Sequence, residues 1–524
     1  MNLVKRKKFK YGSLAIGLTV AVVAFIIILN AVFSALANHF FWYFDMTPGQ
    51  IYQLSDNTIK YIDKINGEEN DIVIYFLTDK DNLNMPVNSS NSISDTTLWG
   101  MKPIYELALQ LDDKYDFISV DYIDLASEPD KIKSIVGEDS YVTTNFTTSY
   151  ILVVNNTYER NSDGSIIKGA DGKPIKYTDY RLCDRRSFYL YEYYTGNVNA
   201  FRGDYYFAAI MMSLTKVNKP NVYFLAGHSE SIGAVNDKSP SSYGNALALY
   251  YLFDEAGCNI RKIDLQYDDF DANEENSIVV VYGPKQDITS PETTVGINET
   301  DKLKNFLEGE GNSMMIFFDS KFVQLTNFES LLKEYCGVTV SDSVAKDSGE
   351  SSISHDGYAI VGKYPTDRAS KAYKITERLS SADMANKIIF TNALPLTISD
   401  NAKTDAVMLL PKSASTEEYG DSAALMTMTS ADNGGKIFVC GSTEFANNIL
   451  LESDIYSNKN LIFSALYEMN IGEVPMNIEY KVVRSEGLDR TEQEARIWTV
   501  AVSVVLPLIV AIIGTVVYIR RKHS

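Results

Sequence analysis

Apolar residues form two long runs, one near each end of the chain. No charged residue occurs between Lys10 and Asp45, and the run 13–37 is almost wholly apolar, as is the run 497–519. An α-helix rises about 1.5 Å per residue, so the 25 residues of the first run would reach about 37 Å. That length is enough to cross a hydrocarbon core of about 30 Å. The pattern therefore predicts a transmembrane helix at each end.

Basic residues outside these runs set the expected orientation. Five lie in the tail 1–12 and three in the tail 520–524. Because Lys and Arg are retained on the cytoplasmic side, we expect a plasma-membrane protein with both termini cytoplasmic and residues 40–496 extracytoplasmic. The alternative for the first run is a signal peptide cleaved after Ala37, within an Ala-Leu-Ala pattern.

Two residues of the second run bear on helix packing. Pro507 removes a backbone donor in mid-span and predicts a kink. Gly514 is one of several small residues that either allow close contact with a neighbouring helix or simply face lipid.

Between the two runs, short apolar segments alternate with segments of helical periodicity. In the first part, the helical segment is 99–114 and the strand-like segments are 72–77, 117–123, 148–154 and 181–194. The order strand, helix, strand predicts a parallel pair with a crossover helix, and the last two strands predict a hairpin. The polar stretch 161–174 between them is expected to be an exposed loop or hairpin tip. We predict a smaller α/β domain over residues 45–215.

The second part repeats the alternation more regularly. Its strand-like segments are 221–225, 260–265, 277–282, 313–318 and 436–440. Its helical segments are 245–255, 299–308, 327–335 and 458–469. This order predicts a doubly wound α/β domain over 216–475, followed by a juxtamembrane linker over 476–496.

Composition and charge narrow the possible chemistry. The chain carries 48 Lys and Arg against 68 Asp and Glu, a net charge of −20, and without its eight terminal basic residues the middle is near −28. Such a surface repels phosphate backbones, so nucleic acid is not an expected partner. The four cysteines are far apart and form no Cys or Cys/His cluster, so neither a zinc site nor a disulfide framework is expected. Cys258, Cys336 and Cys440 lie in or next to predicted core elements, which predicts buried core thiols.

The segment that follows the predicted strand 221–225 is the most suggestive for function. It reads Ala-Gly-His-Ser-Glu-Ser, so Gly227, His228 and Glu230 lie at the carboxyl end of a strand. A nucleophile elbow needs the pattern G-x-S-x-G, which Ser229 lacks because Ser231 follows it two positions later. A structural role for His228 and Glu230 is favoured, and a binding role stays open. Phosphate-loop and dinucleotide motifs are absent from the sequence.

Five blocks in order carry a resemblance to a known family. They are 201–210, 222–230, 279–319, 441–448 and 505–521, which include the predicted binding or structural residues Gly227, His228, Glu230, Asp319, Glu444 and Asn448. Together they resemble the GldG family, the membrane-anchored auxiliary subunits of ABC-type transport systems, including gliding-motility systems. The chain departs from the family at Asp204, where Glu is usual, and at Ser442, which replaces an acid.

This resemblance implies a non-catalytic subunit. The outer domain would be similar to the GIFT domain, a fold related to class I glutamine amidotransferases, and the partners would be an ABC permease and a separate ATPase subunit at the membrane. No catalytic residue, cofactor or metal is expected. The alternative is a stand-alone membrane-tethered hydrolase or ligand-binding ectodomain that uses His228 and Glu230.

Overall fold

The structure is a computed structural model of the chain. The residues that it describes are 17, 20–33, 45, 47, 49–84, 100–161, 163–191, 196–230, 232–271, 274–290, 298–320, 323–347, 351–380, 387–400, 402–414, 423–453 and 456–483.

Among these residues, no helix is both long and apolar enough to cross a membrane. Residues 20–33 of the first apolar run are helical. The prediction of transmembrane helices flanking the α/β region, and the membrane localisation built on it, is therefore wrong. The run 497–519, with Pro507 and Gly514, and both basic tails lie outside the described residues.

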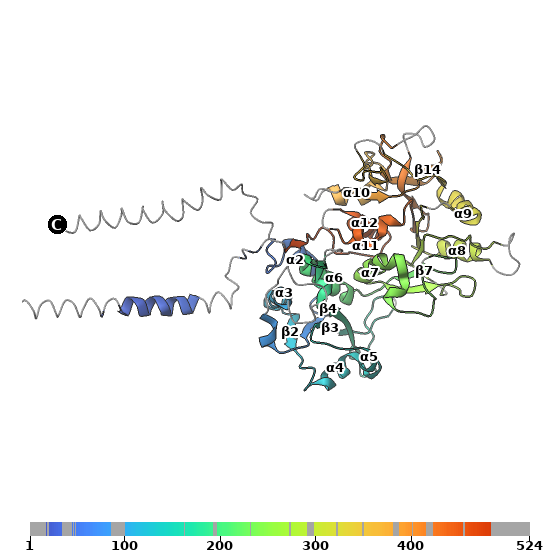
Figure 1. Cartoon of the computed structure of the whole chain (residues 1–524). Coiled ribbons are helices and arrows are strands. Elements are labelled where there is room, and N and C mark those ends of the chain that lie inside the picture. Colours follow the sequence, from blue (N-terminus) through green and yellow to red (C-terminus); the bar gives the residue numbers. More distant parts are fainter. Residues whose placement is uncertain are drawn as a thin grey trace, which may run out of the picture.

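The first α/β unit is built on a four-stranded sheet with the order β2-β1-β3-β4 (Figure 1). Its strands are β1 (Asp71–Phe76), β2 (Ile118–Tyr122), β3 (Tyr150–Tyr158) and β4 (Lys176–Asp184). β1 and β2 are parallel, whereas β3 is antiparallel to both β1 and β4. The predicted parallel pair and the predicted hairpin are confirmed, although β4 begins earlier than expected.

Helices and a small second sheet complete this unit. The helices are α2 (Asp56–Ile62), η1 (Lys80–Asn84), α3 (Met101–Lys114), α4 (Pro129–Val136), α5 (Glu138–Thr143), η2 (Arg185–Phe188) and α6 (Gly203–Thr215). The small sheet has the order β18-β6-β5 and consists of β5 (Tyr189–Tyr191), β6 (Val198–Phe201) and β18 (Lys481–Val482).

A nine-stranded sheet forms the centre of the second unit, with the order β11-β14-β16-β17-β10-β9-β7-β8 and β15 beside β16. The parallel part consists of β7 (Asn221–Leu225), β8 (Asn259–Ile263), β9 (Ile278–Tyr282), β10 (Ser313–Phe317) and β17 (Lys436–Cys440). The antiparallel part consists of β11 (Val338–Val340), β14 (Leu396–Ile398), β15 (Thr404–Leu409) and β16 (Ala424–Ser430). A separate pair is β12 (Ala359–Val361) with β13 (Ile389–Thr391).

Helices cover both faces of this sheet (Figure 1). They are η3 (Pro240–Ala246), α7 (Leu247–Glu255), α8 (Glu299–Glu308), α9 (Thr326–Cys336), α10 (Tyr373–Ser380), η4 (Glu444–Ala446), α11 (Asn448–Leu451) and α12 (Asn458–Glu468). α8 and α9 pack on one face, and α7, α10 and α12 pack on the other.

The alternation of side chains along each strand explains why the central strands are apolar throughout. In β9, Val280 faces the layer of α7 and α12, whereas Val279 and Val281 face the layer of α8 and α9. Successive residues of a strand point to opposite faces, so a strand covered on both sides needs apolar residues at every position. All five residues of β9 and of β10 are buried, as the sequence predicts for this part of the sheet.

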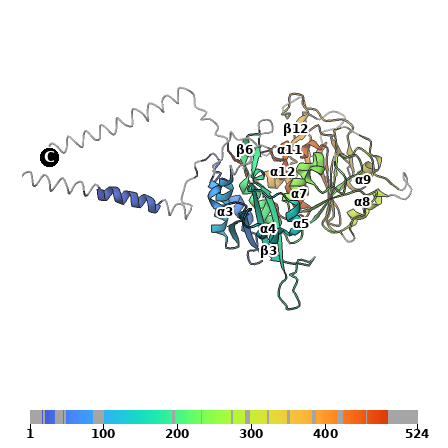
Figure 2. The same ribbon diagram turned by 60° about the horizontal axis from the view of Figure 1, so that its bottom comes forward.

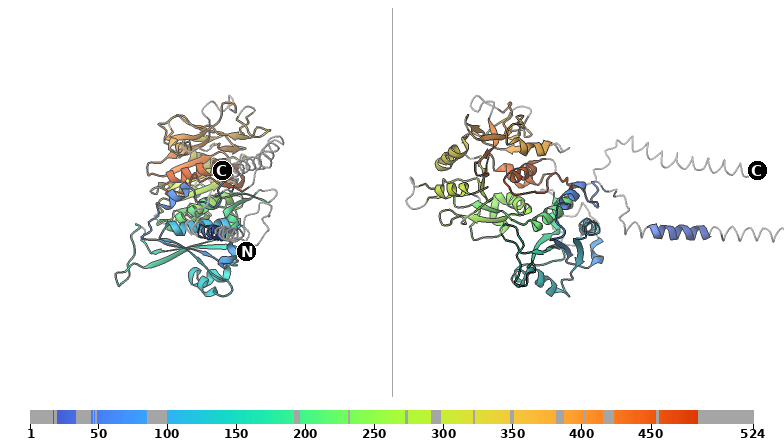
Figure 3. Two further views of the ribbon diagram at one scale, coloured as in Figure 1. Left: turned by 90° about the vertical axis from the view of Figure 1, so that its left-hand side faces the viewer. Right: turned by 180° about the vertical axis from the view of Figure 1, so that it is seen from behind.

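The two ends of the described body lie side by side (Figure 3). β18 pairs with β6 of the first unit, and a methyl group on Gly49 would lie 3.0 Å from the backbone nitrogen of Val482. Residues 476–483, which we expected to belong to a linker, are therefore packed on the body. This contact ties the first unit to the chain segment that leaves the second.

The β3–β4 hairpin continues beyond the sheet as an arm formed by residues 159–175 (Figure 2). Within the arm, Ile167 donates a backbone hydrogen bond to Glu159 and Ile175 donates one to Ile167. The polar stretch that we predicted to be an exposed loop or hairpin tip is thus a small self-paired extension.

Candidate functional site

The carboxyl ends of the parallel strands gather most of the predicted site residues at one edge of the nine-stranded sheet. β7 leads into Gly227, His228 and Glu230, β10 leads into Asp319, and β17 leads into the segment with Glu444. Parallel strands end at the same edge, and open α/β sheets bind ligands there. This edge is the first place to look for a functional site.

His228 lies between two carboxylates in the interior. Its Nε2 atom is 3.0 Å from Oε1 of Glu299, and its Nδ1 atom is 3.4 Å from Oε1 of Glu230. All three side chains are at most 1% exposed. Glu299 is the first residue of α8, 71 positions away along the chain, so the sequence offered no signal for this pairing.

Further hydrogen bonds fix the two carboxylates. The backbone N–H of His228 donates to Oε2 of Glu230 at 2.7 Å. The backbone and the hydroxyl of Thr289 donate to Oε2 of Glu299 at 2.7 and 2.9 Å. The cluster therefore connects the loop after β7 to the start of α8, and it holds these two segments together in the interior.

The same contacts set the protonation state of the histidine. Burial by itself disfavours the charged imidazolium, but hydrogen bonds and attraction to Glu230 and Glu299 outweigh it and raise the pKa of His228 to about 9. Burial likewise opposes ionisation of Glu299, yet its bonds with His228 and Thr289 lower the pKa of this carboxyl. At neutral pH the cluster holds an imidazolium beside carboxylates.

The turn before the cluster requires unusual backbone angles. Gly227 has a φ of 106° and Ser229 a φ of 60°. A methyl group on Gly227 would also lie about 3.0 Å from the carboxylate of Asp264, so glycine suits this position for two reasons. The predicted role of Gly227 as a turn residue is confirmed.

This arrangement is unsuited to nucleophilic catalysis by Ser229. A serine nucleophile needs a histidine nitrogen within hydrogen-bond reach. Both ring nitrogens of His228 face carboxylates instead, and the ring is 1% exposed. A substrate therefore has no access to His228 or Glu230.

The other predicted site residues lie further along the edge. Asp319 is about a quarter exposed, and its Oδ2 atom is 3.9 Å from Nζ of Lys285. Glu444 accepts a hydrogen bond from the side chain of Asn392 at 2.8 Å. Asn448 is exposed at the start of α11. The structure joins Lys285 to the His228 loop through its backbone, which donates to the carbonyl of His228, but it joins neither Glu444 nor Asn448 to that cluster.

All four cysteines are buried, which confirms the prediction made for Cys258, Cys336 and Cys440. Burial raises the pKa of the Cys183, Cys258 and Cys440 thiols to about 12 and that of Cys336 to about 11. A thiol with such a pKa supplies almost no thiolate at neutral pH. In the part of the chain that the structure describes, no group of three His, Cys, Asp or Glu side chains is arranged to hold a metal ion.

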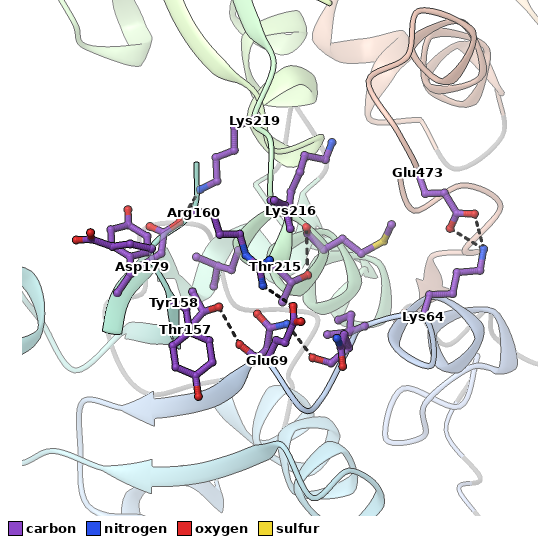
Figure 4. A pocket seen from close by; sticks show the side chains of 18 of the residues that line it. Lys64, Glu69, Thr157, Tyr158, Arg160, Asp179, Thr215, Lys216, Lys219 and Glu473 are labelled. Carbon is purple, nitrogen blue, oxygen red and sulfur yellow. Dashed lines mark hydrogen bonds and ion pairs between the residues drawn. The ribbon is translucent and has the colours of Figure 1, made fainter. Parts of the chain in front are cut away.

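A large cleft lies at the opposite edge of the sheet, near the start of β7 and β8 (Figure 4). Its volume is about 1140 Å³, and residues of the β3–β4 hairpin, of the α6–β7 connection and of the loop before β1 line it. None of its lining residues was a predicted site residue. They come from segments that only the fold brings together.

No protein-family model matches the chain, and no curated protein is significantly similar to it. The resemblance to the GldG family therefore remains a prediction that rests on the residues of this chain.

Proposed function

We propose that this chain is a non-catalytic auxiliary subunit of an ABC-type transport system, which acts by binding the permease and a separate ATPase subunit. One observation carries the proposal. The edge of the sheet where α/β enzymes hold their reactive groups is occupied by an internal ion cluster around His228, with both imidazole nitrogens directed at carboxylates.

The family-like blocks support the proposal by their placement. Thr443 of the fourth block donates a backbone hydrogen bond to Phe318 of the third block at 2.8 Å. The hydroxyl of Tyr282, also in the third block, donates to the carbonyl of Thr443 at 2.8 Å. Blocks that are distant in sequence therefore form one continuous region, which is expected if they serve a common structural purpose.

Binding by this region would use its exposed side chains. Ile449 follows the fourth block and is 69% exposed on α11, next to the exposed Asn448. An exposed branched apolar side chain adds affinity when a partner covers it. The strong negative charge argues against nucleic acid as that partner.

Purification of the tagged full-length chain from its own cells tests the proposal. After gentle lysis and lysine crosslinking, we expect mass spectrometry to identify a multi-span permease and a soluble ATPase. Recovery of the chain without either protein, or with an unrelated enzyme complex, would contradict the proposal.

Two exposed apolar positions provide a matched pair of variants. Ile449→Asp should reduce recovery of the partners, because it places a charge in the proposed contact. Val142→Asp changes a side chain that is 74% exposed on α5 of the first unit, and it should leave recovery unchanged. Equal recovery with both variants would place the contact away from α11.

A further inference from the structure

We propose that the cleft at the amino edge of the nine-stranded sheet binds a neutral, hydroxyl-rich chain, that is, an oligosaccharide. This inference is independent of the transport role, since it rests on a different edge of the sheet. The cleft lies between the two α/β units and has a volume of about 1140 Å³.

Three segments converge on the cleft (Figure 4). One face of the β3–β4 hairpin forms a wall, with Thr157 directly opposite Tyr177 and with Asp179 two positions further along β4. The end of α6 and the connection to β7 form the floor, and the loop before β1 with Glu473 closes the remaining side. Because the two units supply different walls, the cleft depends on how they pack together.

Charges around the cleft balance one another. Four cationic and four anionic side chains line it: Lys64, Arg160, Lys216 and Lys219, and Glu69, Glu159, Asp179 and Glu473. Lys64 pairs with Glu473 at 2.6 Å, Lys219 pairs with Asp179 at 2.5 Å, and Arg160 pairs with Glu69. A site for a strongly charged ligand would carry an excess of the opposite charge. This cleft has none, which favours a neutral ligand.

The fourth cation, Lys216, is bound to backbone carbonyls instead of a carboxylate. Its ammonium group donates to the backbone carbonyls of Ala256 and Ile471, at 2.5 and 2.8 Å. These two bonds tie the group into the floor rather than offering it to an anion, and burial lowers its pKa.

Paired side chains still present many donors and acceptors to a ligand. The Arg160 guanidinium has five N–H donors, and its bonds to Glu69 and to the carbonyl of Gly164 come from its two terminal nitrogens. Carboxylate oxygens likewise accept several bonds each. Neighbouring hydroxyl groups on a sugar ring both donate and accept, so they match a surface that is densely polar and has no net charge.

Tyr177 supplies a flat apolar surface on which a sugar ring can lie. It is 47% exposed on the cleft wall. An aromatic ring is a flat apolar face with a polar tip. The C–H face of a sugar ring can lie against such a surface while its hydroxyl groups bond to the ion pairs beside it.

The size of the cleft favours a chain of sugars over a single one. Pockets for small molecules measure about 300–1,000 Å³ and enclose most of the ligand. At about 1140 Å³, this cleft exceeds that range and is open to solvent. It therefore fits several sugar units better than one metabolite.

Titration calorimetry with defined probes tests the proposal. The purified full-length chain, in buffer free of glycerol and sugar-based detergents, would be titrated with neutral linear oligosaccharides of the malto-, cello- and chito-series, four to eight units long. We expect at least one series to bind and longer members to bind more tightly. Tyr177→Ala should weaken that binding by about tenfold or more, which corresponds to about 1.4 kcal/mol.

Tyr267→Ala is the matched control. Tyr267 is 83% exposed but lies beyond the carboxyl end of β8, whereas the cleft contains Asn259 at the start of that strand. This variant should bind like the parent chain. Absence of binding to all three series, equal weakening by both tyrosine variants, or binding confined to charged oligosaccharides or to peptides would overturn the proposal. A negative result in the calorimetry would not change the recovery of the permease and the ATPase that the proposed transport role predicts.

Discussion

His228 shows how residues distant in sequence determine the state of one side chain. One carboxylate that contacts it is two positions away and the other is 71 positions away. Burying charges is costly, and a buried ion pair is no guarantee of stability compared with an apolar core. Once the pair is buried, however, loss of one charge leaves the other without compensation. The cluster therefore makes folding sensitive to the protonation of His228.

We predict a decline in stability at alkaline pH that depends on this residue. The pKa of His228 is raised from 6.5 to about 9 in the folded chain, so the folded state holds its proton more tightly. The associated stability is fully present below about pH 6.5 and is lost as the pH rises through about 9. Its size is roughly 3 kcal/mol at most. Urea unfolding at several pH values measures it.

Two histidine variants separate this effect from other titrations. His228→Gln should flatten the decline between pH 6.5 and 9. His355→Gln removes an exposed histidine and should keep the slope of the parent chain. Parallel pH profiles for the parent and the His228 variant would rule out the proposed role of the cluster.

At the level of elements, the sequence located the buried parallel strands of the nine-stranded sheet and missed its antiparallel strands β11, β14, β15 and β16. β9 and β10 are continuous apolar runs, and a run of that kind has few alternatives to a strand covered on both faces. β16 is equally buried, yet it contains Thr427, Thr429 and Ser430. Thr429 is tolerated because its hydroxyl bonds to the hydroxyl of Thr404 on the neighbouring β15 at 2.7 Å. That compensation is invisible before the strands are paired.

The β3–β4 arm is predicted to be dispensable for folding. Replacing residues 160–174 with Asn-Gly keeps Glu159 opposite Ile175 and supplies a two-residue hairpin turn. The arm is largely paired with itself, and its ion pair with the body, Arg160 with Glu69, is partly exposed, so the free energy of unfolding should change by less than about 1 kcal/mol. Ile151→Ala, in the buried part of β3, should cost about 2–5 kcal/mol by comparison. Denaturant titration monitored by circular dichroism compares the two, and a larger loss for the arm deletion would show that the arm supports the body.

At the level of the whole molecule, a buried ion cluster connects the two units. Glu255 at the end of α7 lies 2.9 Å from Lys459 of α12 and 3.8 Å from Arg202, which precedes α6. All three side chains are at most 11% exposed. Burial opposes ionisation of Glu255, but Lys459 and Arg202 outweigh it and lower the pKa of this carboxyl. The cluster thus connects α7 and α12 of the second unit to the start of α6 in the first unit.

Glu255→Gln is predicted to weaken this connection between the two units strongly. The substitution leaves two buried cations without their common partner, so it should cost about 3–5 kcal/mol. Differential scanning calorimetry should show a lower melting temperature and partial separation of the two units into distinct transitions. Asp432→Asn changes a surface pair with Lys403, in which Asp432 is 88% exposed, and should leave the transition unchanged. A single unshifted transition for the Glu255 variant would contradict the prediction.

The sequence by itself determined the features that depend on local pattern: the α/β alternation, the buried parallel strands, the hairpin, the burial of the cysteines and the turn at Gly227. These follow from the periodicity of apolar positions and from backbone sterics, which act between near neighbours. The tertiary structure decided everything that depends on pairing between distant segments. Glu299 beside His228, the strands β11 to β16, the packed segment before residue 484 and the cleft between the units all belong to that group. An apolar run also predicted a membrane span over 13–37, whereas no helix among the described residues is long and apolar enough to cross a membrane.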